Sequence, residues 1–361
     1  MADGARLAHR VWRASSPAAR LLRAALLVPA AGYRAAVALR NAAYDLGVLR
    51  SSRLPLAAVG VGNLAVGGVG KTPVAAFLAG ELARRGARPG LLLRGYRGGD
   101  EVAEHRARTP AAVVVADPDR RRAASQAVAQ GAEVLVLDDC LQHRAVRPDA
   151  LLVVVAAETA GEPMWPLPAG PWREGLRALG RGDGVVVTYK TAEAEAAASV
   201  ARRLAPLTGS GIGVAVALEI ARLVALAGGT PLAATWLHGR EVVALCGIGE
   251  PEAFRAQLER LGARVRLHAY GDHHAYRPAE VAEALAAAGP AGTVVTTAKD
   301  AARLRPLWPA AAPACLVAEL AVRVTYGEED LARLLDRIGR AAHPPTRSVA
   351  AGTPPDHRMP Q

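Results

Sequence analysis

A glycine-rich stretch at residues 61–73, Val-Gly-Asn-Leu-Ala-Val-Gly-Gly-Val-Gly-Lys-Thr-Pro, constrains the fold of this chain more than any other feature. An apolar run at 56–61 precedes it and a helical pattern at 74–85 follows it, which is the context of a phosphate-binding loop. Ala65 stands where the longer form of this motif has glycine, so the stretch fits the compact Gly-Gly-x-Gly-Lys-Thr variant. We predict a nucleotide site formed by Gly67, Gly68, Val69, Gly70, Lys71 and Thr72.

The chemistry of the loop depends on its last residues. Backbone N–H groups of the glycines can surround phosphate oxygens, Lys71 can reach the terminal phosphates, and the Thr72 hydroxyl can bind Mg²⁺. The sequence has only three lysines, Lys71, Lys190 and Lys299, and the other 41 of its 44 basic residues are arginine. Because a compact ammonium fits a tight phosphate loop better than a broad guanidinium, this bias gives a chemical reason for lysine at position 71.

Composition narrows the class of protein. The chain has 361 residues, of which 51% are apolar and 21% charged, so it is long enough for two globular domains. Its net charge of +11 favours an anionic partner, which is nucleic acid, an acidic membrane surface or a phosphorylated substrate. Aromatic residues make up only 4%, which counts against single-stranded nucleic acid.

Three cysteines, Cys140, Cys246 and Cys315, lie far apart in the sequence and form no Cys-x-x-Cys pair. This spacing indicates neither a disulfide framework nor a structural zinc site. We expect a reducing, cytosolic setting in which each cysteine is a small buried hydrophobe.

The segment 17–50 repeats apolar residues among arginines. Its longest uncharged run, 24–33, is well short of the roughly 20 residues that span a bilayer. Arg23 and Pro29 interrupt the apolar stretch, so a signal peptide fits poorly. Two interpretations stay open on pattern alone: an amphipathic, arginine-edged helix pair on an anionic membrane, or two helices packed on the nucleotide domain.

Apolar runs and helical patterns alternate after the glycine loop. We predict a parallel sheet with crossover helices. Its strands are expected at 91–94, 111–115, 134–138, 151–155 and 185–188, and its helices at 74–85, 119–130 and 192–204. A second series is expected to have strands at 212–218, 242–245, 265–268, 294–297 and 316–324, and helices at 251–261, 278–288 and 328–338.

The runs 212–218 and 316–324 bracket the second series, so we expect them to pair as a hinge between two lobes. The predicted fold class is therefore α/β, with a P-loop NTPase-like parallel sheet lobe and a smaller α/β lobe joined by a two-stranded linker. The predicted parts are N-terminal helices at 1–50, a P-loop lobe at 51–211, linker strands and second lobe at 212–324, a C-terminal helix at 325–342, and a disordered tail at 343–361.

A second strong signal is Asp138-Asp139 at the end of the apolar run 134–137. Ligands of an open parallel sheet bind at the carboxyl ends of its strands, so these carboxylates are placed to hold Mg²⁺. Three weaker clusters are Gly-Asp-Glu at 99–101, the Pro-rich loop 168–174 and Asp-His-His at 272–274. Each alone is more often a surface turn.

Taken together, these motifs in this order resemble the tetraacyldisaccharide 4′-kinase family, which phosphorylates the lipid A disaccharide precursor in Gram-negative bacteria. The resemblance runs from about residue 20 to about residue 335. Besides 61–73, it rests on Arg-Gly-Tyr at 94–96, Gly-Asp-Glu at 99–101, Asp-Asp-Cys-Leu-Gln-His-Arg at 138–144, Pro-Ala-Gly-Pro-Trp-Arg-Glu at 168–174, Cys-Gly-Ile-Gly at 246–249, Gly-Asp-His-His at 271–274 and Thr-Ala-Lys-Asp at 297–300.

The resemblance implies a kinase that uses ATP and Mg²⁺ to convert a tetraacyldisaccharide 1-phosphate to lipid IVA. It implies a peripheral, monotopic protein whose N-terminal helices rest on the cytoplasmic face of the inner membrane. The expected partners are the lipid A precursor and the anionic membrane surface, with no nucleic acid and no obligate protein partner.

The same resemblance implies roles for individual residues. Asp100 is expected to be the base that accepts the proton of the sugar 4′-hydroxyl, with His273 as its partner. Lys71 and Arg173 are expected at the phosphates. The expected Mg²⁺ and nucleotide-organising residues are Thr72, Asp138, Asp139 and Glu174.

Three departures from the family pattern stand out. The family usually has Gly-Phe where this chain has Cys140-Leu141, and a glutamate where this chain has Ala298. Only Arg97 and Gly98 separate Arg-Gly-Tyr from Gly-Asp-Glu, so Asp117 or Asp119 is the alternative to Asp100 if the alignment shifts.

The alternative function is a membrane-associated P-loop switch ATPase of the partitioning or positioning type. Such proteins carry a signature lysine immediately before the two glycines, where this chain has Val66. They also have no counterpart of the second lobe.

Overall fold

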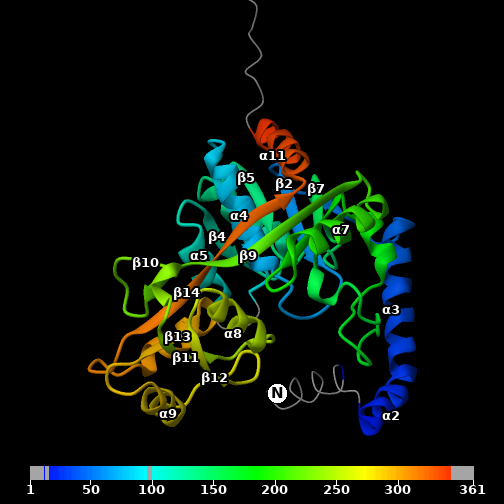
Figure 1. Ribbon diagram of the computed structural model, residues 1–361. Coiled ribbons are helices and arrows are strands. Elements are labelled where there is room, and N and C mark those ends of the chain that lie inside the picture. The colour runs from blue at the N-terminus through cyan, green and yellow to red at the C-terminus, as the bar shows by residue number, and fades with distance from the viewer. Residues whose placement is uncertain (1–11, 13–15, 96–99, 343–361) are drawn as a thin grey trace, which may run out of the picture.

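The computed structural model describes residues 12, 16–95 and 100–342, without the side chains of residues 100, 101 and 103 (Figure 1). Within these residues a twelve-stranded sheet runs through both halves of the molecule, in the order β12-β11-β13-β14-β9-β8-β7-β2-β5-β3-β4, with β10 paired to β9. The predicted fold class is confirmed. The predicted tail at 343–361 lies outside the described residues.

The P-loop lobe contains a parallel six-stranded part of this sheet, in which β2 carries the glycine loop at its carboxyl end. Its strands are nearly fully buried, as expected where helices cover both faces of a sheet. The strands are β2 (Ala58–Asn63), β3 (Pro89–Leu93), β4 (Val113–Ala116), β5 (Val134–Leu137), β7 (Ala150–Ala156) and β8 (Gly184–Tyr189). The helices are α4 (Lys71–Arg84), α5 (Asp100–Arg108), α6 (Arg120–Ala129) and α7 (Ala194–Leu204).

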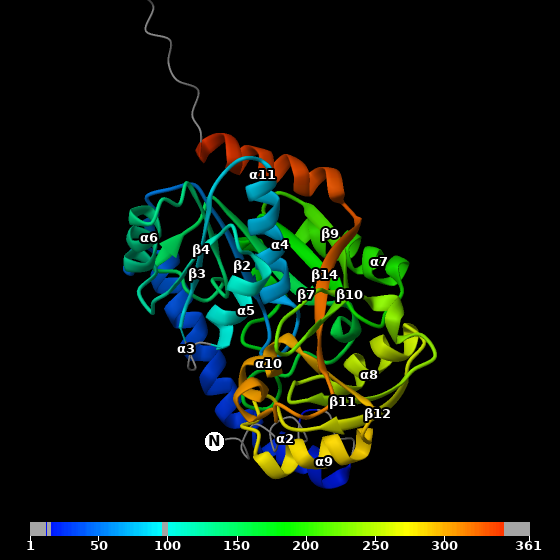
Figure 2. The same ribbon diagram turned by 90° about the vertical axis from the view of Figure 1, so that its left-hand side faces the viewer.

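Two long strands, β9 (Ile212–Ala225) and β14 (Cys315–Tyr326), join the lobes. They pair in antiparallel fashion from Leu316 opposite Ala225 to Tyr326 opposite Ala215, so the predicted pairing of the two bracketing runs is confirmed. Figures 1 and 2 show both strands crossing from one lobe to the other. Because the sheet is continuous through them, the domain bounds at residues 50, 211 and 324 stay predictions.

The second lobe places helices on both faces of its strands. Alternate residues of β11 face opposite sides: Val242 and Ala244 pack with Phe254 of α8, whereas Val243 and Leu245 pack with α9 and α10. The elements are β10 (Leu232–Ala233), β11 (Glu241–Cys246), β12 (Arg264–Ala269), β13 (Thr293–Thr297), α8 (Pro251–Arg260), α9 (Pro278–Ala288) and α10 (Ala298–Leu304).

The C-terminal helix α11 (Glu328–Ala342) returns to the P-loop lobe. Leu331, Leu334, Leu335 and Ile338 recur at helical spacing and are buried in the same core as Leu78 of α4. This amphipathic stripe explains why the sequence pattern predicted the helix.

Short elements went unpredicted. The charged helix α5 has no apolar stripe, α10 has seven residues, and β1 (Ser52–Arg53) pairs with β6 (Val146–Arg147) over two residues each. The 3₁₀ turns are Ala157–Thr159, Leu176–Arg181, Ala205–Leu207, Ala234–Leu237 and Arg305–Leu307. Such short segments carry too few residues to show a period.

The N-terminal segment forms the predicted helix pair, α2 (Pro17–Ala25) and α3 (Leu27–Asp45). Ser16 caps α2, and Pro29 falls in the first turn of α3, where a missing N–H costs little. No single described helix is long and apolar enough to cross a bilayer, although α2 and α3, bent by 43°, pass that test of length and composition as a pair. Both helices lie along one side of the molecule (Figure 1).

Candidate active site

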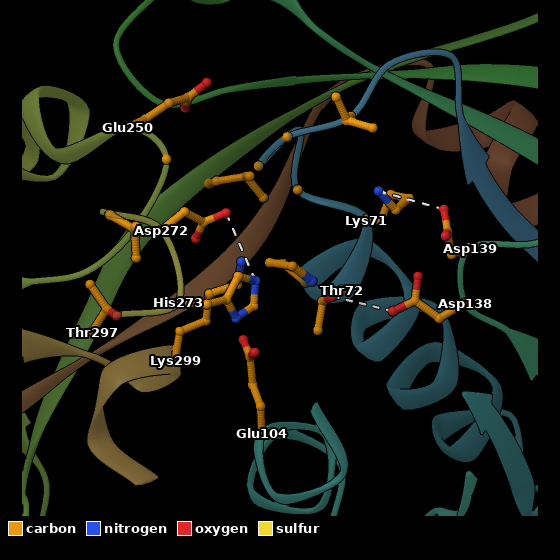
Figure 3. A pocket seen from close by; sticks show the side chains of 18 of the residues that line it. Lys71, Thr72, Glu104, Asp138, Asp139, Glu250, Asp272, His273, Thr297 and Lys299 are labelled. Atoms are coloured by element: carbon orange, nitrogen blue, oxygen red, sulfur yellow. Dashed lines mark hydrogen bonds and ion pairs between the residues drawn. The ribbon is translucent and has the colours of Figure 1, made fainter. Parts of the chain in front are cut away.

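A cavity of about 840 Å³ opens at the carboxyl end of β2, between the two lobes. It is lined by Tyr33, Val37 and Arg40 of α3, by the glycine loop, and by second-lobe residues that include Ile248 and Phe254. Figure 3 shows the side chains of both lobes pointing into this space. The cavity therefore joins the P-loop, the N-terminal helices and the second lobe in one site.

The glycine loop turns sharply before α4. Gly67 and Gly70 have φ values of 125° and 88°, in the left-handed region that favours glycine. The Thr188 hydroxyl donates to the Val69 carbonyl at 2.7 Å, and the Val69 side chain packs against the core rather than facing the cavity. Of the predicted nucleotide residues, Gly67, Gly68, Gly70, Lys71, Thr72 and Arg173 line the cavity.

Lys71 lies near the second carboxylate of the Asp-Asp pair. Its Nζ is 3.7 Å from Oδ1 of Asp139, which also accepts from Nη1 of Arg173 at 3.1 Å. Burial lowers the pKa of Lys71, although the charges of Asp139 and Asp138 oppose this shift. Asp139 has φ of 53°, a strained conformation of the kind found at functional sites.

Asp138 is held by three elements. Its Oδ2 is 3.2 Å from the Thr72 hydroxyl and 3.2 Å from Nε2 of the buried His105, and Arg120 donates to its backbone carbonyl. Although burial opposes the shift, the hydrogen bond and charge of His105 keep the pKa of Asp138 below its usual range. The buried Oδ1 has no partner among the described residues, so a carboxylate oxygen is available beside Thr72.

The loop that carries Arg173 and Glu174 is tied to the P-loop. The amide of Val66 donates to Pro171 at 2.8 Å, and the amide of Arg173 donates to Leu64 at 2.8 Å. The carboxylate of Glu174 accepts hydrogen bonds from three side chains, Arg181 at 2.7 Å, Asn41 at 2.8 Å and Gln142 at 3.1 Å. Glu174 thereby links α3 to the site, and its predicted role at the metal stays a prediction.

His273 faces the P-loop lobe from the second lobe. It has φ of 58°, its amide donates to the Gly247 carbonyl at 3.0 Å, and its Nε2 is 3.8 Å from Oδ2 of Asp272 (Figure 3). Residue 100 begins α5, but its side chain lies outside the described part of the chain. The predicted dyad of Asp100 with His273 therefore stays a prediction.

The three cysteines are buried and free, as predicted, and burial raises the pKa of each thiol to about 12. In the described part of the chain, no group of three or more His, Cys, Asp or Glu is arranged to hold a metal ion. Oxygen ligands for a divalent cation are nevertheless present at Thr72 and Asp138.

Sequence reasoning missed several residues that build the site. His105 lies on the unpredicted α5, and the fully buried Arg120 begins α6. Lys190 donates from Nζ to the Gly68 carbonyl at 2.8 Å and to Glu250 at 2.6 Å. The scarcity of lysine is the signal that points to Lys190 and Lys299, because both line the same cavity as Lys71.

The relatives that this chain resembles in sequence share the name tetraacyldisaccharide 4′-kinase. The family model described as tetraacyldisaccharide-1-P 4′-kinase matches residues 22–340. A tetraacyldisaccharide 4′-kinase of Anaeromyxobacter sp. strain Fw109-5 is 36% identical over 91% of this chain and 95% of its own length. Another, of Anaeromyxobacter dehalogenans strain 2CP-C, is 39% identical over 83% of this chain and 86% of its own.

A solved structure agrees with these relatives. LpxK from Aquifex aeolicus in complex with ATP superimposes with a TM-score of 0.69 and 27% identity, covering 88% of this chain and 99% of that one. The sequence matches and the fold agree. The chain therefore belongs to the tetraacyldisaccharide-1-P 4′-kinase family.

Proposed function

We propose that this chain transfers the γ-phosphate of ATP to the 4′-hydroxyl of a tetraacyldisaccharide 1-phosphate and so produces lipid IVA. The names of its relatives support this reaction. The observation that carries it is that the P-loop with Lys71 and the second-lobe residue His273 line one cavity, which α3 also borders. A nucleotide and a lipid-bearing sugar can thus meet there.

The transfer depends mainly on positioning and charge. In the reaction the 4′-oxygen bonds to the γ-phosphorus, the bond from that phosphorus to the β,γ-bridging oxygen breaks, and ADP leaves. Negative charge on the phosphate oxygens needs fixed cations, and Lys71 and Arg173 supply them in a partly buried site.

We propose Mg²⁺ as the metal, held by the Thr72 hydroxyl and Asp138, with Asp139 close by. The unpartnered buried Oδ1 of Asp138 and its lowered pKa fit a cation ligand. When bound, Mg²⁺ neutralises charge on the β- and γ-phosphates. Glu174 is the weaker candidate ligand, because its carboxylate already accepts three hydrogen bonds.

For the acceptor proton we propose Asp100 as base, oriented by His273. These residues belong to different lobes, so the pair is complete only when the lobes close on both substrates. This arrangement restricts ATP hydrolysis in the absence of the lipid acceptor. An open-locked variant whose hydrolysis rate stays unchanged counts against it.

We further propose that α2 and α3 rest on the cytoplasmic face of the inner membrane, with the anionic surface as partner. The side chains of Leu21, Val28 and Leu39 are 74%, 80% and 75% exposed, so these two helices present large apolar side chains to the surroundings. Arginines on the same helices suit anionic headgroups. Because α3 also lines the cavity, it can lead a membrane-held acceptor to the site.

The test is transfer of labelled phosphate from ATP to a tetraacyldisaccharide 1-phosphate in detergent micelles. We expect Lys71→Ala to reduce transfer by about 10²–10³-fold. Asp100→Ala should collapse transfer as well if residue 100 is the base. Arg264→Ala, which removes an exposed second-lobe charge, is the control and should stay near wild type.

The opposite outcome is equally informative. A wild-type protein that transfers no phosphate, but hydrolyses ATP faster with bare liposomes, would refute the kinase and favour the switch ATPase. The comparisons do not favour that alternative.

A further inference from the structure

All three lysines of the chain line the same cavity, although arginine is otherwise its almost exclusive basic residue. Two of the three have partners in the protein. Lys71 lies near Asp139, and Lys190 bonds the Gly68 carbonyl and Glu250. Among the described residues, the ammonium of Lys299 makes no hydrogen bond or ion pair. Lys299 is thus the one lysine of the three that has no partner in the part of the chain that the structure describes.

Lys299 is delivered by the second lobe. It is the second residue of α10, between Ala298 and Asp300, and its side chain is partly buried. In Figure 3 it extends toward the middle of the pocket on the side of His273, whereas Lys71 enters from the P-loop side. The two ammonium groups therefore approach one space from opposite lobes.

The charges around this space favour an anion between the two lysines. Arg173 and Lys299 add positive charge to the cavity that Lys71 lines. Arg94 and Arg108 line the cavity too, and its carboxylates are Glu104, Asp138, Asp139, Glu174, Glu250 and Asp272. Of these, Asp139 is shared by Lys71 and Arg173, and Glu104 is paired with Arg108. Glu174 is paired with Arg181 and Glu250 with Lys190.

We propose that Lys299 is a second phosphate-binding lysine, which contacts the γ-phosphate of ATP from the lobe opposite Lys71. This inference rests on the proposed function, in which the glycine loop holds ATP. Lys71 reaches the terminal phosphates from the loop, and Lys299 stands next to His273, on the side where the acceptor hydroxyl approaches. A compact ammonium suits this place for the same reason as at position 71, because it fits between a phosphate and crowded protein atoms.

A contact from Lys299 to the γ-phosphate lets the second lobe distinguish ATP from ADP. A lysine that bonds only the γ-phosphate strengthens the binding of ATP and leaves that of ADP unchanged. It also draws the second lobe, with His273, toward the P-loop only when a transferable phosphate is present.

The test measures nucleotide binding to the full chain in detergent and needs no acceptor lipid. Titration calorimetry with Mg²⁺ compares ADP with a non-hydrolysable ATP analogue for wild type, Lys299→Met and Lys299→Arg. We expect Lys299→Met to weaken the analogue by about tenfold or more, as for a lost charge-assisted hydrogen bond, and ADP by less than about twofold. Lys299→Arg should recover only a small part of the preference for the analogue, because the broader guanidinium does not fit the crowded space as the ammonium does.

The matched control is Arg264→Ala, which removes one positive charge from the same lobe outside the cavity. It should change neither affinity by more than about twofold, which separates a local contact from the overall field. Unchanged affinities in Lys299→Met, or equal losses for both nucleotides, would overturn the proposal. So would a raised KM for the lipid acceptor with intact preference for the analogue, because that result assigns Lys299 to the acceptor. If wild type binds neither nucleotide, the nucleotide site itself fails, and this inference fails with it.

Discussion

At the scale of single residues, Gly62 decides how closely the loop that carries Asp138 and Asp139 approaches the P-loop strand. A Cβ built at Gly62 would lie 2.6 Å from the backbone nitrogen of Leu141, whereas one at Gly80 in α4 meets nothing within 4 Å. We expect Gly62→Ala to destabilise the fold by about 1–3 kcal/mol, because the loop after Asp139 must move. Gly80→Ala should instead stabilise it by up to about 1 kcal/mol. Urea unfolding measures both, and equal effects of the two substitutions would contradict the close approach.

The residues of the site differ in how far the sequence could predict them. Lys71, Thr72, Asp138 and Asp139 were predicted because each belongs to a local motif, and the structure brings them together. His105 carries no such signal, since its role depends on a contact with Asp138, 33 residues away in the sequence. For Glu174 the sequence motif predicted only part of the role. Its side chain lies at the cavity as expected, but its hydrogen bond with Asn41 of α3 joins residues far apart in the sequence, which the motif does not reveal.

At the scale of elements, the turn before α9 fixes the position of His273. His274 stacks on Tyr270 with ring centroids 4.5 Å apart and lies 2.8 Å from Glu280, which also bonds the amide and side chain of Arg277. Although burial opposes the shift, these hydrogen bonds lower the pKa of Glu280 to about 2. The stabilisation is therefore complete above the ordinary glutamate pKa of about 4.3 and is lost as the pH falls toward 2.

We accordingly expect Glu280→Gln to reduce the free energy of unfolding by about 1–2 kcal/mol at pH 7. The difference from wild type should shrink steadily between about pH 4.5 and pH 2.5. Glu283→Gln, at an exposed position of the same helix, is the control and should show little change at any pH. Chemical unfolding across this pH range measures the effect. A difference that stays constant with pH would mean that the Glu280 charge does not hold the turn.

Elements were predictable in proportion to their length and pattern. α11 has a full apolar stripe and β5 a continuous apolar run, so both were expected near their observed bounds. α5 and α10 were not, because a short charged helix is formed by contacts with the opposite lobe and not by its own period. Glu104 and Arg108 of α5 and Lys299 of α10 line the cavity, so the unpredicted elements also help to form it.

At the scale of the whole molecule, the lobes are joined by the sheet and also by a contact over the P-loop. Lys190 bonds the Gly68 carbonyl at 2.8 Å and Glu250 at 2.6 Å, which links the glycine loop to the start of α8. We expect Glu250→Gln to loosen this link and to speed amide hydrogen exchange at residues 66–70 several-fold. Glu319→Gln, which breaks the Arg222 pair on the linker strands, is the control and should leave those amides unchanged. Equal exchange in both variants would show that Glu250 does not hold the loop.

At the same scale, the proposed membrane surface is formed by α2 and α3, for which the sequence alone left two interpretations open. Exposed Leu21, Val28 and Leu39 favour insertion of these helices among lipid headgroups, and the net charge of +11 favours an anionic membrane.

We expect wild type to cosediment with vesicles that contain phosphatidylglycerol, and less so at high salt, because salt screens the arginine charges. Replacing these three residues by aspartate should abolish cosedimentation and leave ATP binding intact. Leu207→Asp, at an exposed leucine distant in sequence, is the control and should keep both vesicle cosedimentation and ATP binding. Undiminished vesicle binding by the triple variant would show that these helices do not form the membrane surface, and the positive charge elsewhere on the molecule would then have to account for binding.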